Sequence, residues 1–572
     1  MVRASRAPAI LAVLGLVLAS CQAQPAPTVA FEPQDLRFSG ERAMELETEF
    51  VLQFPHRHSG QPNNRLAAEW LQQRFSTLGF SCGLDDWEII NYSRPVKLNN
   101  VVCKLPGSSA REILVVAHLD QAPTTIQGAD NDGSGIAILL ELAQIFAAEP
   151  THPHTLAFVA TDAEEYGMLG SGHYIETHPD PKTVVAAISL DNLGRPYYDG
   201  MSMELIGQFK GYGPIWLALA TRQAARAAGA QWPVYLRSTI DQITDQAAPV
   251  SLMDQGPLVA AGVPAIGLAG HVPAQLSEAH FNMWHDPSDT LEQQSAETLG
   301  QAGLIAEALI RQLLHMERFP RVSGPYLYFD ESGQVLRGAP LWAIFLAFIA
   351  VFLIASLLIG RRSAAGLPRG WRLALPHFLG LWLPLVASIV LLYGLVAAGL
   401  MDNYHLYPAT SKDPLLYHPR WPAVITFVVG LALFLPAGRR LAARAGAAPQ
   451  AADVKSLSML AISLGALYIL AVNPFGLLFL VPLLFWLLIR LHQGWGRALD
   501  ILFFLLGGLI AYALIYVFGF IVLRLNFAML WYLLNMFSIR MISFPMAAVI
   551  MAILAAGLAM ITNVPARAGT QA

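Results

Sequence analysis

Three apolar runs in the first half of the chain lead directly into histidine or acidic residues. They are residues 111–120 (REILVVAHLD), 155–165 (TLAFVATDAEE) and 184–194 (VVAAISLDNLG), and the glycine-flanked loop 128–135 (GADNDGSG) follows the first. Each run has the length and apolar character of a buried strand. In an open, mostly parallel sheet, ligands bind beyond the carboxyl ends of the strands. The pattern therefore predicts a sheet with a polar site along one edge.

Helix-like segments alternate with these strands. Amphipathic periodicity predicts them at 41–54, 61–80, 134–148, 212–229 and 295–316. Strands that alternate with helices of this length predict an α/β fold, in which helices sandwich a mixed, mostly parallel sheet. We place this domain at residues 35–318.

The second half of the chain has a different composition. The 572 residues are 55% hydrophobic and 13% charged, and this average blends an ordinary globular half with a strongly apolar one. We predict an all-α transmembrane domain of about seven helices over residues 341–562, with spans at 341–360, 374–399, 421–437, 457–472, 475–490, 499–523 and 543–562. The spans contain almost no ionisable residues, which argues against a transporter.

The N-terminus has the features of an export signal. Arg3 and Arg6 precede an apolar stretch at 8–18, and Leu18-Ala19-Ser20-Cys21 follows. This end resembles the bacterial lipoprotein cleavage box, in which Cys21 becomes the lipidated first residue. The alternative is an ordinary signal peptide or an uncleaved anchor. We expect a signal peptide at 1–21 and a linker at 22–34.

Loop charges predict the orientation of the membrane half. If residues 35–318 lie outside, most of the loop Arg and Lys residues are cytoplasmic, as at Arg361, Arg362, Arg439 and Arg440. We therefore expect a multi-pass protein of the bacterial cytoplasmic membrane, whose first domain lies on the periplasmic or extracellular side. A linker at 319–340 would join the two domains, and 563–572 would form a cytoplasmic tail.

Two further cysteines lie in the first half, at Cys82 and Cys103. Both occupy short strand-like stretches that could pair as antiparallel neighbours. In an oxidising compartment a disulfide between them is one possibility, and two buried free thiols are the other.

The residues at the strand ends are of types that bind zinc. Zinc takes histidine nitrogen and carboxylate oxygen, and paired zinc ions about 4 Å apart share a bridging carboxylate. His118 would supply an imidazole, and Asp120 would hold its orientation. The loop residue Asp130 could bridge two metals, while Glu165 and Asp191 would each complete one shell. Glu164 could move protons.

Each of these features has a plainer explanation when taken alone. An adjacent Glu-Glu pair also occurs in solvated turns, and a lone histidine can be a hydrogen-bonded core residue. The coincidence of several correctly placed segments favours a metal site. The net charge of −4, without a long basic run in this half, gives no reason to expect nucleic acid as a partner.

The motifs AHLD, GADNDGSG, DAEEYGMLGS and SLDNLG resemble those of the zinc aminopeptidases of metallopeptidase family twenty-eight, over about residues 42–315. This resemblance implies two zinc ions per chain and Glu164 as the general base. One zinc would be held by His118 and Asp191 and the other by Glu165 and His285, with Asp130 as the bridge.

His285 is chosen because Asp and Thr follow it at four and five residues, whereas its rival His280 lacks this spacing. The chain departs from the family at Met253-Asp254-Gln255, where relatives often have Ser-Asp-His. Its apolar second half is similar to that of the membrane-anchored branch of the family, known from vacuolar and endoplasmic-reticulum proteases.

The sequence therefore predicts a membrane-anchored two-zinc exopeptidase, an aminopeptidase acting on peptides with a free N-terminus outside the cytoplasm. Two alternatives stay open. One is a glutaminyl cyclase-like acyltransferase with a single zinc, and the other is an inactive peptidase-like scaffold in a membrane complex. Side-chain preference and oligomeric state do not follow from the sequence.

Overall fold

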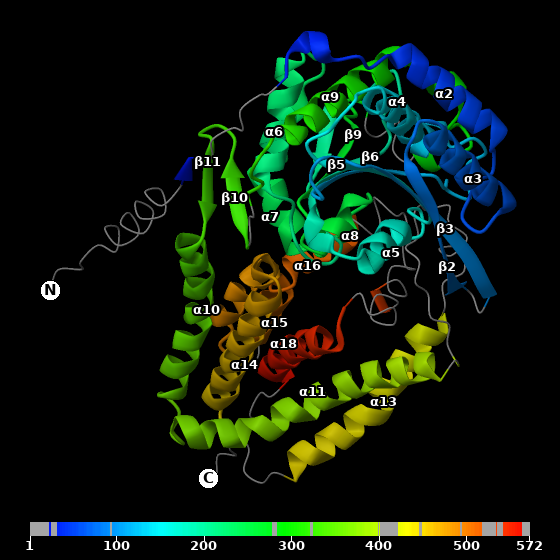
Figure 1. The fold of residues 1–572 in the computed structure, drawn as a ribbon. Helices are drawn as coiled ribbons and strands as arrows, with labels where there is room; N and C mark the ends of the chain where they lie inside the picture. Colours follow the sequence, from blue (N-terminus) through cyan, green and yellow to red (C-terminus); the bar gives the residue numbers. More distant parts are fainter. Residues whose placement is uncertain are drawn as a thin grey trace, which may run out of the picture. The chain divides into compact units, whose positions relative to one another are not determined.

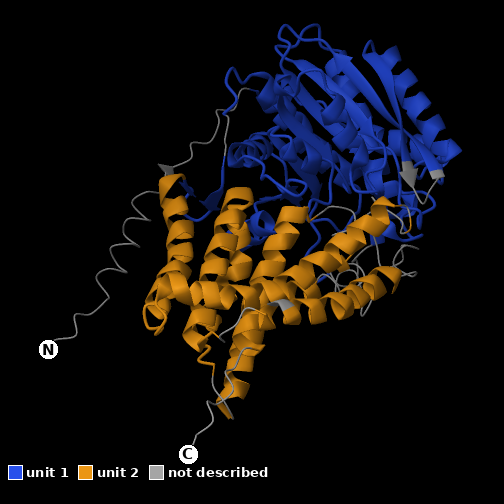
Figure 2. Cartoon of the chain, turned by 90° about the horizontal axis from the view of Figure 1, so that it is seen from below, with its two compact units in different colours: residues 1–337, 405–413 blue, residues 338–404, 414–572 orange. Residues whose placement is uncertain are grey.

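The computed structural model describes most of the chain, in the ranges 22–23, 31–91, 94–276, 283–320, 324–398, 400, 421–444, 449–491, 495–517, 533–534 and 542–562. The chain divides into two compact units (Figure 2), unit 1 with residues 1–337 and 405–413, and unit 2 with 338–404 and 414–572. The expected signal peptide with Cys21, the loop 402–420 and the tail 563–572 lie outside the described residues.

Unit 1 is built on one mixed sheet of eight strands. Their order across the sheet is β2 (Ser81–Asn91), β3 (Arg94–Leu105), β5 (Thr155–Thr161), β4 (Glu112–His118), β6 (Val184–Leu190), β9 (Ala265–Gly270), β7 (Met201–Glu204) and β8 (Val234–Tyr235). The central strands β5, β4, β6 and β9 are mutually parallel, while β2–β3, β3–β5 and β7–β9 pair in antiparallel fashion. The predicted mixed, mostly parallel sheet is confirmed.

Helices cover both faces of this sheet, because the central strands are apolar on both sides. In β4, Ile113, Val115 and Ala117 pack into the core on one face, whereas Leu114 and Val116 pack into the core on the other. The first face is covered by α2 (Gly40–Gln53), α3 (Pro62–Thr77), α4 (Gly135–Ala147), α6 (Ile215–Ala227) and α9 (Ala296–Leu314), and the second by α5 (Leu169–Thr177) and α8 (Gln255–Ala260) (Figure 1).

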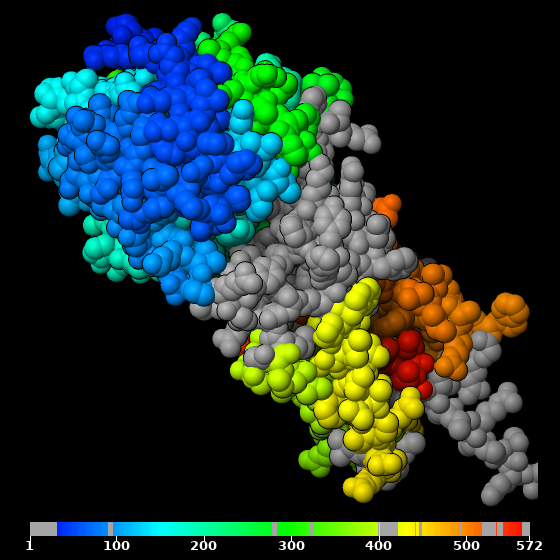
Figure 3. Space-filling view, turned by 90° about the vertical axis from the view of Figure 1, so that its right-hand side faces the viewer, coloured from blue at the N-terminus to red at the C-terminus, as the bar shows by residue number. Residues whose placement is uncertain are grey.

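The β2–β3 pair joins the two cysteines of this half. Cys82 lies opposite Cys103 in the strand register, and a disulfide links them with the Cα atoms 4.1 Å apart. Helices α2 and α3 form much of the blue surface of unit 1 in the space-filling view (Figure 3).

A second, smaller sheet has the order β1 (Gln22–Ala23), β11 (Gln334–Arg337) and β10 (Tyr326–Phe329). Its strands β10 and β11 lie within the segment 319–340 that the sequence assigned to a linker. Helix α7 (Thr239–Ala247) is held to β10 by a hydrogen bond in which Gln242 Nε2 donates to the carbonyl of Tyr328 at 3.0 Å.

Unit 2 is helical throughout its described residues. Its elements are α10 (Ala339–Gly360), α11 (Leu367–Ala397), α13 (Trp421–Ala443), α14 (Ala451–Val472), the 3-10 helix η6 (Pro474–Leu488), α15 (Trp495–Leu506), α16 (Leu509–Leu514) and α18 (Phe544–Thr562). Within the described ranges, α10, α11, α13, α14 and α18 are long and apolar enough to span a membrane. The predicted helical membrane-type domain is thus present.

Among the described residues the candidate spans number five, compared with about seven predicted over residues 341–562. Segment Pro474–Leu488, a 3-10 helix of 15 residues, is a shorter apolar helix and does not count among the five. The predicted span 499–523 falls on a pair of helices, Trp495–Leu506 and Leu509–Val517, bent by 56°. Counting that pair as one broken span gives six candidates.

Candidate metal centre

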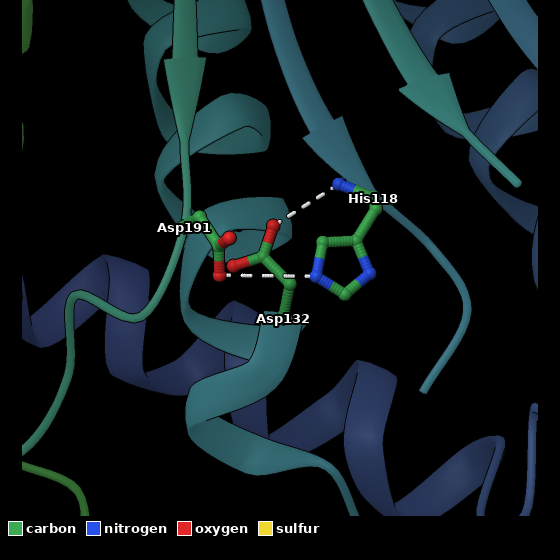
Figure 4. A group of neighbouring side chains, drawn as sticks. All are labelled: His118, Asp132 and Asp191. Carbon is green, nitrogen blue, oxygen red and sulfur yellow. Dashed lines mark hydrogen bonds and ion pairs between the residues drawn. The ribbon is translucent and has the colours of Figure 1, made fainter. Parts of the chain in front are cut away.

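The candidate ligands lie at the carboxyl ends of three neighbouring strands. His118 is the last residue of β4, Asp191 follows β6 directly, and Glu164 and Glu165 lie just beyond β5. Because these strands are parallel and adjacent, their carboxyl ends meet at one edge of the sheet. The side chains of His118, Asp132 and Asp191 converge there (Figure 4).

The imidazole of His118 is buried at the centre of the cluster, with 1% of the residue exposed. Its Nε2 lies 3.8 Å from Asp191 Oδ1 and 4.0 Å from Glu164 Oε2. Among the described residues, two groups bring their ligand atoms within 4.8 Å of one another: His118, Asp132 and Asp191, and His118, Glu164 and Glu165. Both groups could hold a metal ion.

Asp120 organises this cluster without joining either group. Its Oδ1 lies 3.3 Å from His118 Nδ1 and accepts the backbone N–H of Glu164 at 3.1 Å. Its Oδ2 accepts the backbone N–H of Glu165 at 3.3 Å. One buried carboxylate therefore orients the imidazole and also positions the Glu-Glu pair.

His285 lies against Glu165. It ends the short 3-10 helix η4 (Met283–His285), and its Nε2 is 3.0 Å from both carboxylate oxygens of Glu165. The hydroxyl of Thr124 donates to the carbonyl oxygen of His285 at 2.6 Å, which fixes this segment beside the loop after β4. The rival His280 lies outside the described residues.

Asp130, the expected bridge, lies away from the cluster. Its Oδ1 accepts the backbone N–H of Gly194 at 2.8 Å, and its Oδ2 accepts Tyr198 Oη at 2.6 Å and Arg195 Nε at 3.1 Å. The neighbouring residue Asn131 lies where the bridge was expected. In the irregular turn η2 (Ala129–Ser134), adjacent side chains point in different directions, so a shift of one residue changes which side chain faces the site.

The sequence reasoning missed the residues that hold this loop. Asp289 accepts the backbone N–H groups of Asp130 and Asn131 at 2.9 and 3.2 Å and also pairs with Arg195 Nη2 at 3.0 Å. Asp132 accepts the backbone N–H of His118 at 3.0 Å. The four-residue spacing that selected His285 already contained Asp289, and it was the available signal for this role.

Burial and crowding disfavour the ionised form of the carboxylates in the cluster. Burial raises the pKa of Glu164 well above its usual range, and the nearby carboxylates of Glu165 and Asp191 raise it further. Burial likewise raises the pKa of Asp132, with Asp191 again contributing. For His118, burial lowers the pKa, but hydrogen bonds to Asp120 and Asp191 outweigh it and the net shift is well upward.

These observations fit a bound dication. The donor set consists of imidazole nitrogen and carboxylate oxygen, the types that zinc prefers, and the buried carboxylates outnumber the cations beside them. A dication would supply the missing positive charge and favour the ionised carboxylates.

The segment Met253-Asp254-Gln255 lies near the same edge. Asp254, 2% exposed, accepts a hydrogen bond from the hydroxyl of Thr161, the last residue of β5. Burial raises the pKa of Asp254 to about 6. Gln255 donates instead to Glu204 Oε1 and Ser251 Oγ, each at 2.9 Å. Asp254, the acidic residue of the Ser-Asp-His pattern, thus lies beside the end of β5. Gln255, which stands where relatives often have histidine, contacts Glu204 and Ser251 instead.

Residues 100–310 match the model of the family described as Peptidase family M28. The chain is 29% identical over 191 residues to the alkaline phosphatase isozyme conversion protein of Escherichia coli (strain K12), covering 29% of this chain and 54% of that protein. It is 28% identical over 214 residues to aminopeptidase YwaD of Bacillus subtilis (strain 168), covering 36% of this chain and 42% of that protein. The chain thus spans about half the length of these curated relatives.

A vacuolar membrane protease of Candida dubliniensis is 26% identical over 161 residues, covering 26% of this chain and 17% of that protein. Among solved structures, BSAP, a zinc aminopeptidase from Bacillus subtilis, aligns with a TM-score of 0.42 and 15% identity, covering 50% of this chain and 98% of that one.

Proposed function

We propose, since residues 100–310 form a peptidase domain of family M28, that the protein is a zinc-dependent exopeptidase. In this proposal it is an aminopeptidase that removes N-terminal residues from peptides outside the cytoplasm. The observation that carries the proposal is the buried cluster around His118, whose carboxylates outnumber its cations at the ligand-binding edge of the sheet.

Two pairs of side chains could hold zinc in this proposal. His118 and Asp191 form one pair, and Glu165 and His285 form the other. Zinc bound here would polarise the peptide carbonyl and make a water molecule easier to deprotonate. Asp120 would keep the imidazole of His118 in its binding orientation. Whether these pairs hold the two zinc ions expected from the sequence depends on the residue between them.

Glu164 is the residue best placed to move protons. Its carboxylate lies 4.0 Å from His118 Nε2, and its backbone is fixed by Asp120. With only 8% of the residue exposed, bulk water competes weakly for its proton. Glu164 would take a proton from the attacking water at its carboxylate and pass it to the nitrogen of the leaving amine.

The acidic character of the cluster supports a substrate with a free amino terminus. The carboxylates of Glu165, Asp191 and Asp254 all disfavour ionisation of Glu164, and an ammonium group nearby would relieve this repulsion between like charges. An acetyl cap removes that charge. The positioning of the reacting carbonyl would then suffer more than the overall affinity for the peptide.

The localisation in this proposal comes from the apolar helices of unit 2. Five helices long enough to span a membrane support attachment to a lipid bilayer. The loop charges support a bacterial cytoplasmic membrane with the peptidase domain on the outer side.

The test is peptide hydrolysis by the full chain purified in detergent. A panel of aminoacyl anilides and matched peptides, free or N-acetylated, is assayed before and after chelation and after zinc is restored. We expect zinc-dependent release of N-terminal residues from the free peptides alone. Equal cleavage of both forms would indicate an endopeptidase, and ring closure of N-terminal glutamine without hydrolysis would indicate a cyclase. If chelation reduced neither peptide hydrolysis nor ring closure, the zinc mechanism would be excluded.

A further inference from the structure

Asn131 lies between the two pairs of candidate zinc ligands. Its Oδ1 is 2.8 Å from His118 Nε2, and its Nδ2 donates to Glu165 Oε1 at 2.5 Å. The orientation of the amide follows from chemistry, because an ionised carboxylate only accepts hydrogen bonds and the NH₂ group must therefore face Glu165. The residue is 3% exposed, so the amide is enclosed by the site.

An amide cannot do what a bridging carboxylate does. A carboxylate offers one oxygen to each of two metals and a negative charge that attracts both. The asparagine side chain is neutral and has one oxygen acceptor, and its nitrogen offers no lone pair but presents two hydrogens, which repel a cation on that side. Here the amide oxygen of Asn131 faces His118, and its NH₂ group faces Glu165.

Neither neighbouring aspartate replaces the bridge. Both oxygens of Asp130 are engaged by Gly194, Arg195 and Tyr198, and the guanidinium of Arg195 is fully buried against them. The two oxygens of Asp132 accept backbone N–H groups, from His118 and from Gly135 at 2.9 Å. Asp132 groups with His118 and Asp191 and not with Glu165.

The Glu165–His285 pair already has an internal partner. The 3.0 Å contacts between His285 Nε2 and the Glu165 carboxylate satisfy the two groups as an ion pair or hydrogen bond. A zinc ion at either pair would have to replace contacts of this kind, since His118 Nε2 also lies against Asn131 Oδ1. The two sides differ in the atom that the amide offers: an oxygen that can bind zinc faces His118, whereas the NH₂ group faces Glu165.

We propose that the site holds one tightly bound zinc ion, carried by His118 and Asp191 with the Asn131 amide oxygen, and that Glu165 and His285 remain paired with each other. This inference rests on the proposed zinc dependence and corrects the expected number of ions. Asn131 would be the residue that sets that number.

The experiment measures zinc content of the full chain, stripped with a chelator, equilibrated with buffered zinc and analysed by elemental mass spectrometry. We expect about one zinc ion per chain for the wild type and about two for Asn131→Asp, because the substitution restores a bridging carboxylate. His285→Ala should leave the single ion of the wild type in place. The same change in the Asn131→Asp background should return the content from about two to about one.

Asp130→Asn is the control, since it makes the reverse exchange of the same two residue types one position away, with a change of charge of equal size and opposite sign. It should leave the zinc content unchanged, and the zinc-induced rise in melting temperature serves as a second readout if its expression falls. A wild type that binds two ions with similar affinity would overturn the inference, as would Asn131→Asp remaining at one. Loss of zinc in His285→Ala would overturn it too.

The outcome for the proposed function is read separately. A wild type with one zinc ion that hydrolyses no peptide would remove the peptidase assignment and leave the stoichiometry standing. A wild type with two zinc ions and aminopeptidase activity would overturn the stoichiometry and leave the peptidase assignment standing. A wild type that binds no zinc would remove both.

Discussion

The two units of the chain place their charged side chains differently. In unit 1, His118, Glu164 and Asp191 are buried together beyond the ends of parallel strands. In unit 2, Asp453 and Lys455 of helix α14 instead satisfy local groups of the protein. Asp453 in the first turn of α14 accepts the backbone N–H of Gln450 at 2.9 Å, and Lys455 donates to the carbonyl oxygen of Leu487 at 2.6 Å.

This difference separates a reaction site from a support. Several buried carboxylates around one imidazole are costly unless a cation or a reaction makes use of them. A charge that caps a helix or joins two loops has its partner in the protein and needs no ligand. In the proposed function the chemistry belongs to unit 1 and membrane attachment to unit 2, and the following changes test that division.

The largest effect is expected from Glu164→Gln. The amide cannot take a proton from water, so turnover should fall by about 10²- to 10⁴-fold while the zinc content stays the same. Glu176→Gln, a change of the same kind at an exposed position of α5, should match the wild type. Peptide turnover and zinc content measured on the same preparations decide the point. Near-normal turnover of the Glu164 variant would remove it as the base.

A smaller effect, on stability, is expected from Arg195→Met. This change leaves the buried carboxylates of Asp130 and Asp289 without their cation, which typically costs about 3–5 kcal/mol. The melting temperature should fall by several degrees more than for Arg222→Met. Arg222 pairs with the partly exposed Asp330, and such a pair contributes about 0–1 kcal/mol. Equal shifts would mean that the buried ion pairs do not support the site.

Loss of the disulfide should lower the free energy of unfolding by about as much as Arg195→Met, or slightly less. Cys82 and Cys103 are 21 residues apart in the sequence, and closing a loop of this size typically stabilises a fold by about 3 kcal/mol. Replacing both with serine should lower the melting temperature, and a reductant should lower that of the wild type alone. A wild type insensitive to reductant would argue that the bond is absent in solution.

Topology reporters should leave activity and stability unchanged, yet they decide the organisation of unit 2. With seven crossings and the peptidase domain outside, a reporter after Ala572 and one after Leu491 are both cytoplasmic. With five crossings the first stays cytoplasmic and the second is outside. If the reporter after Ala572 lies outside, the number of membrane crossings is even. This would be the case if the bent pair of helices crosses and Pro474–Leu488 does not. We expect both reporters in the cytoplasm, as the loop charges predict.

The sheet could be predicted because its signal is redundant. The run 112–118 is buried at every position and apolar from Ile113 to Ala117, and it ends at the residue that the site uses. The site could be predicted only as far as residues next to regular strands, such as His118 and Asp191. In the loop GADNDGSG several polar side chains follow one another on an irregular backbone, and no periodicity tells which one faces the cluster. The sequence predicts Asp130 as the bridging residue, but it is Asn131 that lies between His118 and Glu165.

The membrane half shows the same limit in another form. Average apolarity located α10, α11, α13, α14 and α18 well, because long helices average over many residues. It could not foresee that residues 474–488 form a 15-residue 3-10 helix, or that the chain bends by 56° after Leu506. Both features depend on local packing around prolines and glycines, which an average over a window does not record.

The contacts of Asp289 have a consequence for the newly made protein. This one carboxylate holds the backbone of Asp130 and Asn131, which lie 159 and 158 residues earlier in the chain. His285, on the same short segment, reaches Glu165 from 120 residues away. A growing chain therefore lacks both the clamp on its loop and its last imidazole until synthesis has passed this point. We expect the nascent protein to be unable to cut peptides until nearly all of unit 1 has been made, so the order of synthesis itself delays the onset of proteolysis.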